Sequence, residues 1–175
     1  MAEGTFMLRM DCLSLRSTNS LAMLAKTALH PDFTISGFPE YATGPTTLAP
    51  EQQRILRDAV IAIARSQVTL QPVAAAIIVG HADKALRKPL QERASFELDI
   101  SQKRATAAAQ SLIQELITQS CGAHYAKTFR YLAFGIGNAK PRHANALNEQ
   151  QMRENRRIEI SLVVTWLGLP HCGTN

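Results

Sequence analysis

The 175-residue sequence lacks the cysteine pattern of a metal site or of a disulfide-rich domain. Its three cysteines, Cys12, Cys121 and Cys172, form no CxxC pair and show no metal-ligand spacing with the five histidines. We therefore expect no metal site. A disulfide between Cys121 and Cys172 stays open for an oxidising compartment, but buried free thiols agree equally well with an odd number of cysteines.

The sequence also lacks a hydrophobic run of the roughly 18 residues that a membrane-spanning helix needs. Its start, Met1 to Gly4, shows no basic stretch followed by an apolar one, which is the pattern of an export signal. The chain as given is therefore expected to be soluble and to carry no visible export signal.

A third missing feature is a basic run interleaved with aromatic residues, which would suit single-stranded nucleic acid. The formal net charge of +5 favours polyanions in general, including nucleic acid, an anionic membrane surface or an acidic cell-wall polymer. Lysine and arginine are scattered, however, with a short grouping at Arg153, Arg156 and Arg157. We therefore expect no nucleic-acid partner, and a basic nucleic-acid-binding domain is kept as an alternative.

What is present is the composition of one globular domain, with 46% hydrophobic and 19% charged residues. Hydrophobic periodicity predicts alternating strands and helices. In chain order these are a helix within 5–30, a strand at 33–38, a helix from Pro50 to about Ser66, a strand at 74–79, a helix from Ser101 that ends by Gly122, a strand at 129–134, a short helix within 145–154 and a strand at 157–164. The fold class is therefore α/β, a βαβαβ(α)β sandwich with a mixed sheet and helices packed on one face.

The stretch from Ala74 to Arg104 is the predicted centre of this domain. An apolar strand without polar alternation, typical of a central strand, runs into Gly80-His81-Ala82-Asp83. A polar loop from Lys84 to Leu98 is expected to follow, and Ser101 is expected to open a helix whose free N–H groups lie beside Arg104. Asp83 and Arg104 would then face a shared crevice that suits a zwitterion, with Asp83 taking an ammonium and Arg104 a carboxylate.

Catalysis is a weaker interpretation of the same residues. His81 lies two positions from Asp83, but this spacing lacks the geometry of a triad, and no serine or cysteine sits in a recognisable nucleophile turn, so a structural histidine is favoured. Asp83 with Glu97 as the carboxylate pair of a cell-wall hydrolase stays as an alternative. Gly135-Ile136-Gly137 lacks the third glycine of a nucleotide loop, so no cofactor is expected.

Four motifs in a fixed order resemble one known family. They are Gly80-His81-Ala82-Asp83, Ile100-Ser101-Gln102-Lys103-Arg104-Ala105, Gly135-Ile136-Gly137 with Pro141, and Asn155-Arg156-Arg157-Ile158-Glu159-Ile160. Their order is similar to that of the OmpA-like peptidoglycan-binding domain, a family that includes the peptidoglycan-associated lipoprotein and the C-terminal domain of MotB-type stator proteins. The likeness covers roughly Phe33 to Val164 and implies an OmpA-C-like fold.

The resemblance also implies a ligand and its contacts. The ligand would be the meso-diaminopimelate of the peptidoglycan stem peptide, bound without covalent chemistry. The implied ligand-binding residues are Asp83 for the ammonium, Arg104 for the carboxylate, Arg156 as a second anion contact, Asn155 orienting the loop, and Glu97 and Ile100. Four features depart from the family: a longer connection at 84–98, no glycine shortly after Asp83, Arg153 two rather than three residues before Asn155, and Glu97 where the family tends to carry asparagine. Glu97 is an extra carboxylate that would repel the ligand's own.

The same resemblance implies a location in the periplasm. The chain would be the soluble part of a longer protein whose membrane anchor lies in a segment absent from this sequence. The alternative is a complete cytoplasmic protein. The expected organisation is an extension or linker at 1–30, the peptidoglycan-binding domain at 31–166 and a tail at 167–175. A stator-like subunit and a homodimer are both compatible with this interpretation, and no catalytic residue is expected.

Overall fold

The computed structural model describes residues 31–39, 48–118, 126 and 129–165. Its strands and helices are β1 (Phe33–Ile35), α2 (Pro50–Ser66), β2 (Val73–Gly80), α3 (Leu90–Thr118), β3 (Arg130–Gly135), α5 (Glu149–Asn155) and β4 (Ile158–Val164). This alternation confirms the predicted order of strands and helices. Within the described residues, no helix has both the length and the apolar character needed to cross a bilayer.

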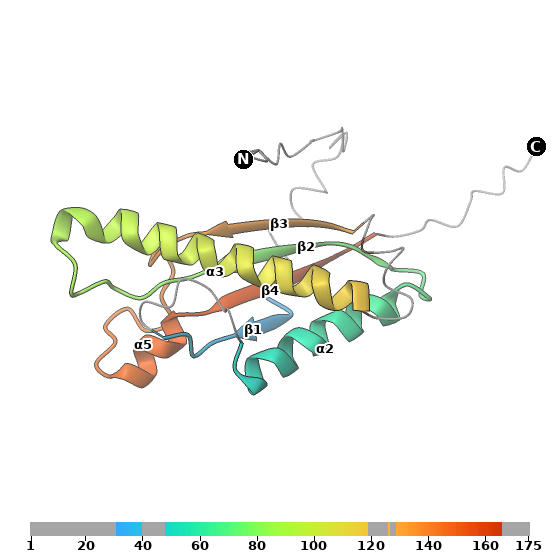
Figure 1. Ribbon diagram of the computed structural model, residues 1–175, viewed down its shortest axis with the longest axis horizontal. Coiled ribbons are helices and arrows are strands. Elements are labelled where there is room, and N and C mark those ends of the chain that lie inside the picture. The colour runs from blue at the N-terminus through green and yellow to red at the C-terminus, as the bar shows by residue number, and fades with distance from the viewer. Residues whose placement is uncertain (1–30, 40–47, 119–125, 127–128, 166–175) are drawn as a thin grey trace, which may run out of the picture.

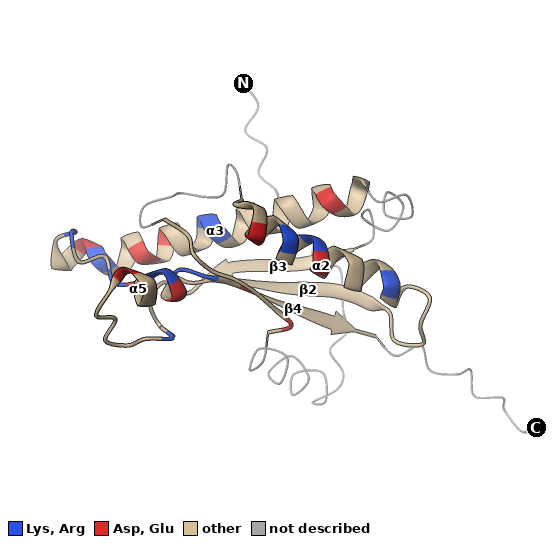
Figure 2. Ribbon diagram, turned by 90° about the horizontal axis from the view of Figure 1, so that it is seen from below, with Lys and Arg blue, Asp and Glu red and all other residues tan. Residues whose placement is uncertain are grey.

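The four strands form one mixed sheet in the order β1-β4-β2-β3. Strand β4 is antiparallel to both of its neighbours, β1 and β2, whereas β2 and β3 run parallel. Helices α2 and α3 lie on the same face of this sheet, as Figures 1 and 2 show from two directions. The α/β prediction with helices on one face is therefore confirmed, and β2 has the interior position that its apolar sequence predicted.

The core lies between the sheet and the two long helices. Alternate residues of β2 and β4 point toward the helices, and α3 meets them with a stripe of small and branched side chains. The fully buried members include Ile35, Val60, Ile63, Ile78, Ala105, Ala108, Leu112, Ile158 and Ile160. Each large aliphatic side chain in this set contributes about 1.5 to 3 kcal/mol through its removal from water.

Helix α3 touches the strand ends with its backbone. A Cβ atom on Gly80 would lie 2.0 Å from the carbonyl oxygen of Ser101, and one on Gly135 would lie 2.2 Å from the nitrogen of Gln102. The side chain of Gln102 accepts a hydrogen bond from Gly135 N at 2.9 Å. Glycine is therefore required at both strand ends, and this contact fixes the helical turn that carries Arg104.

The predicted loop from Lys84 to Leu98 is wrong from Leu90 onward, and the predicted helix start at Ser101 is wrong too. Helix α3 begins at Leu90, directly after Pro89, so Ser101 lies inside the helix and is fully buried. The added turns are built from strong helix formers but extend away from the core, where Leu90 and Leu98 are exposed. Because the stripe of buried residues begins only at Ile100, an amphipathic pattern could not reveal these turns.

Several sequence-based expectations fall outside the described residues. These are the helix within 5–30, the helix end at Gly122, the Cys121–Cys172 disulfide and the tail at 167–175. The division into 1–30, 31–166 and 167–175 also stays a prediction.

The backbone contact between α3 and the sheet predicts that Gly80→Ala or Gly135→Ala destabilises the protein. The added methyl group has no space beside Ser101 and Gln102 and must push the helix outward, which typically costs about 1 to 3 kcal/mol. Urea denaturation would measure this loss. Gln114→Ala, an exposed change on the same helix, is the control and should shift the free energy of unfolding by less than about 0.5 kcal/mol. Unchanged stability of both glycine variants would contradict the close approach.

Candidate functional site

A buried arginine, Arg156, lies between α5 and β4 at the centre of a charged cluster. Its Nε donates to the carbonyl of Phe38 at 2.7 Å, and one terminal nitrogen donates to Asp83 Oδ2 at 2.9 Å. The other terminal nitrogen donates to Glu149 Oε1. The guanidinium is completely buried, and each of its three nitrogens donates to one of these acceptors.

A second buried arginine, Arg104, approaches the same cluster from α3. It donates to the carbonyls of His81 at 3.1 Å and of Pro39 at 3.0 Å, and its guanidinium carbon lies 5.7 Å from the centre of the Phe38 ring. Burial lowers the pKa of Arg104 to about 10, the charge of Asp83 opposes this change, and the charge of Arg156 adds to it. Arg104 therefore stays protonated at neutral pH.

Asp83 supplies the negative charge inside the cluster. Only 7% of the residue is exposed, and burial raises the pKa of its carboxyl group, although Arg156 and Arg104 both oppose this rise. The effect of burial on the pKa of Asp83 is therefore larger than the opposing effect of the two guanidinium groups. Such a pair fixes geometry more than it adds net stability, because its charges have been taken out of water.

The structure brings Asp83, Arg104 and Arg156 together as predicted, but in a different setting. The expected crevice open to solvent is wrong for these side chains, since Arg104 and Arg156 are fully buried. The expected helix N-terminus beside Arg104 is also wrong, because Arg104 follows more than three turns of helix. The cluster instead lies beneath the segments that follow β1 and β2.

The other predicted ligand residues have structural contacts. The side chain of Asn155 accepts from His143 N at 2.8 Å and donates to His143 O at 2.9 Å, so it is bonded to the loop before α5. Glu97 accepts from the backbone of Ala85 at 2.7 Å and thereby holds the connection after Asp83. Ile100 is 2% exposed and packs as an apolar residue.

The sequence analysis did not identify a second group of interacting ionisable side chains, formed by His81, Arg157 and Glu159. Glu159 Oε1 accepts from Arg157 Nε at 2.7 Å, and its other oxygen lies 3.1 Å from His81 Nε2. Burial raises the pKa of Glu159, but the bonds to His81 and Arg157 outweigh it and lower the pKa to about 2. His81 is 2% exposed and has this carboxylate at its ring. The available signal was the alternation of Arg157, just before β4, with Glu159 on β4.

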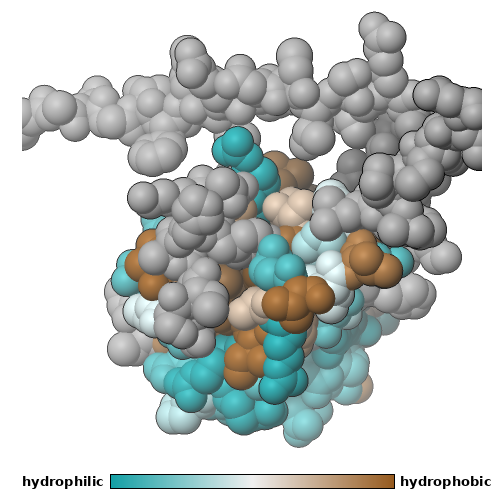
Figure 3. All heavy atoms as spheres, turned by 90° about the vertical axis from the view of Figure 1, so that its right-hand side faces the viewer, coloured by the Kyte–Doolittle hydropathy of each residue, from teal (hydrophilic) through white to brown (hydrophobic). Residues whose placement is uncertain are grey.

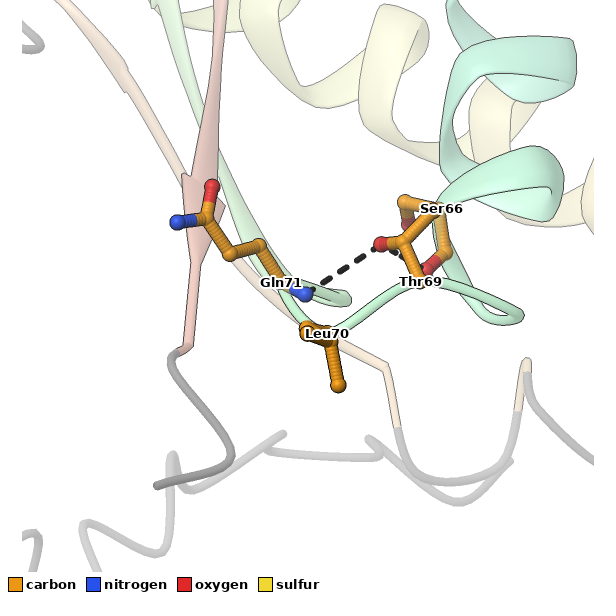
Figure 4. A pocket seen from close by; sticks show the side chains of 4 residues that line it. All are labelled: Ser66, Thr69, Leu70 and Gln71. Atoms are coloured by element: carbon orange, nitrogen blue, oxygen red, sulfur yellow. Dashed lines mark hydrogen bonds between the residues drawn. The ribbon is translucent and has the colours of Figure 1, made fainter. Parts of the chain in front are cut away.

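A surface hollow lies at the other end of the molecule, in the turn between α2 and β2. It is lined by Ser66, Thr69, Leu70 and Gln71, where Gln71 N donates to Thr69 Oγ1 at 3.2 Å (Figure 4). Figure 3 shows this end, where hydrophobic and hydrophilic side chains are interspersed. Because its lining has no ionisable side chain, the charged cluster is the better candidate site. No group of three or more potential metal ligands occurs in the part of the chain that is described.

Comparison with solved structures confirms the predicted fold. The peptidoglycan-associated lipoprotein from Burkholderia pseudomallei superposes with a TM-score of 0.51 at 19% identity, over 76% of this chain and 90% of that one. The cell wall anchor of the T6SS from Pseudomonas aeruginosa gives 0.50 at 21% identity, over 82% and 96%. No protein-family model matches the sequence, and no curated protein matches it either. The chain therefore shares the fold that its four motifs implied.

The buried cluster predicts a strong effect of Asp83→Ala on stability. Removing this carboxylate leaves two buried guanidinium groups without their buried counter-charge, which costs roughly 3 to 5 kcal/mol. Thermal or urea denaturation would measure the loss. Asp58→Ala removes a carboxylate that is 47% exposed and is the matched control, with a change below about 1 kcal/mol. Equal effects of the two substitutions would show that Asp83 is not held as described.

Glu159 predicts a pH-dependent contribution to stability. Its pKa in the folded protein, about 2, lies below the ordinary 4.5, so its contribution is complete above pH 4.5 and is lost as the pH falls toward 2. Glu159→Gln should therefore lower the free energy of unfolding at pH 7, and the difference from the original protein should shrink as the pH falls through this window. A difference that is constant from pH 7 to 2.5 would contradict the contacts that Glu159 makes with Arg157 and His81.

Proposed function

We propose that this chain binds peptidoglycan non-covalently through the diaminopimelate of its stem peptide. It would thereby tether an envelope or membrane-anchored protein to the cell wall. The observation that carries the proposal is the buried Asp83, Arg104 and Arg156 cluster, formed by the same residues that the family resemblance assigns to the ligand. Support also comes from the fold shared with a peptidoglycan-associated lipoprotein and a cell wall anchor.

The chemistry of the cluster suits a zwitterionic ligand with surplus carboxylate. Asp83 would hold the side-chain ammonium, while Arg104 and Arg156 would take carboxylates. In the free protein Arg104 donates to two neutral carbonyls, those of His81 and Pro39. Binding would exchange such neutral acceptors for a carboxylate, which can pair with a guanidinium through two parallel hydrogen bonds.

The two alternative functions find less support. A hydrolase would need Asp83 and Glu97 to work as a catalytic pair, but Asp83 is bonded to Arg156 and Glu97 to the backbone of Ala85. A nucleic-acid-binding domain would need a basic stripe, whereas Figure 2 shows acidic and basic residues interspersed along α2 and α3. We therefore propose a binding module without catalytic activity.

The setting of this module follows from the same proposal. A periplasmic location suits a domain that holds peptidoglycan, and the anchor would lie in a segment absent from this sequence. A stator-like role and a homodimer are both compatible with such a module.

The proposal predicts that the purified protein sediments with insoluble peptidoglycan of the diaminopimelate type at low salt. Release should increase with salt, because charged groups dominate the contact. Arg104→Lys and Asp83→Asn should each weaken binding by about 1.5 to 3 kcal/mol, the range for hydrogen bonds to charged groups. Co-sedimentation at several wall concentrations would give the affinities.

Two controls make this experiment decisive. Arg57→Lys makes the same change at an arginine that is 59% exposed on α2, and it should bind like the original protein. Each variant should be compared below its unfolding midpoint, since the site residues are buried. Absence of co-sedimentation by the original protein would contradict the proposal. Release of soluble muropeptides from the wall would favour the hydrolase instead.

A further inference from the structure

Glu149 closes the buried cluster from the surface. It is the first residue of α5, and 55% of its side chain is exposed, whereas the Arg156 side chain to which it is bonded is 0% exposed. The same oxygen, Oε1, accepts a hydrogen bond from Arg153 Nε at 3.2 Å. A half-exposed carboxylate therefore covers one end of a guanidinium that the protein otherwise encloses.

The charges in the cluster show what Glu149 contributes. Arg104 and Arg156 bring two positive charges into the buried region, and Asp83 brings one negative charge. The buried part thus carries a surplus of one positive charge, which Glu149 balances from outside. A ligand carboxylate at the same nitrogen of Arg156 would provide an identical balance.

We propose that Glu149 occupies, in the free protein, the position on Arg156 that a ligand carboxylate takes, so that ligand binding displaces Glu149 into solvent. This inference rests on the proposed function and names the competitor within its site. Glu149 is then a specificity-determining residue, because a group without a full negative charge cannot replace it.

The surroundings of the two carboxylates explain why Glu149 moves and Asp83 stays. Asp83 is 7% exposed and is held by Arg156 within the buried part of the cluster, so it stays in place. Glu149 already faces water, and its neighbour Arg153, with a side chain that is 60% exposed, can keep it as an ion-pair partner after displacement. The displaced carboxylate therefore loses one charged contact and keeps another, which limits the cost of the exchange.

The exchange predicts a preference between two forms of the stem peptide. A diaminopimelate with a free carboxylate restores the charge that Glu149 supplied. The amidated form offers a neutral oxygen and would leave the buried positive charge unbalanced, at a cost larger than that of one neutral hydrogen bond. Peptidoglycan with free carboxylates should therefore bind more tightly than amidated peptidoglycan.

The test compares Glu149→Gln with the original protein. The glutamine keeps the size of the side chain but competes weakly for Arg156, so we expect binding to insoluble diaminopimelate-type peptidoglycan to tighten by about three- to tenfold, the effect of one competing hydrogen bond. Glu149→Asp keeps the charge on a shorter side chain and should lie between the two. Glu51→Gln, at a carboxylate that is 66% exposed and bonded to another arginine, is the matched control and should change nothing.

A second probe separates this inference from the proposed function. Sulfate titrated into Glu149→Gln by calorimetry should bind, and the original protein should bind it at least threefold more weakly, whether or not either protein binds the wall. Wall binding by the original protein with equal or weaker binding by Glu149→Gln would overturn the displacement while leaving the function intact. Failure of the original protein to bind the wall would overturn the function, and the sulfate comparison would still decide whether Glu149 competes for Arg156.

Discussion

The guanidinium of Arg156 connects the segments that follow β1 and β2 with the start of α5. Its partners are the carbonyl of Phe38 after β1, the carboxylate of Asp83 after β2 and that of Glu149 at the start of α5, which lie 118, 73 and 7 positions away in the sequence. A buried cation costs several kcal/mol unless such partners surround it. The three connecting segments must therefore converge wherever Arg156 is buried, and this convergence creates the candidate site.

The second constraint is the contact between α3 and the strand ends. Since Gly80 and Gly135 let the backbone at Ser101 meet the sheet, the next turn of the helix directs Arg104 into the space beneath the segment after β1. Packing and site geometry consequently depend on the same short stretch of helix. A change that pushes α3 away from the sheet would separate Arg104 from Asp83, even though it touches neither residue.

Sequence patterns predicted the parts of this protein that hydrophobic burial determines. Helix α2 and strands β2 and β4 were predicted within a residue or two at each end, because their apolar periodicity is the cause of their burial. The first turns of α3 carry no such signal, since they extend past the core. The burial of Arg104 was missed for a related reason: an arginine is expected to be exposed, and its carbonyl partners come from distant segments. Glu149 likewise gains its role only through the folded position of Arg156.

The place of β4 in the sheet has a consequence for how the protein is made. This strand comes last among those described, yet it lies between β1 and β2. Before the residues of β4 are synthesised, β1 lacks the strand with which it pairs in the described sheet. Strand β3 and helix α3 can assemble at that stage only around β2. Arg156 and Arg157 arrive immediately before the same strand. The four-stranded sheet can therefore close only after the residues of β4 have left the ribosome, and until then β1 stays without the neighbour that it has in the folded protein.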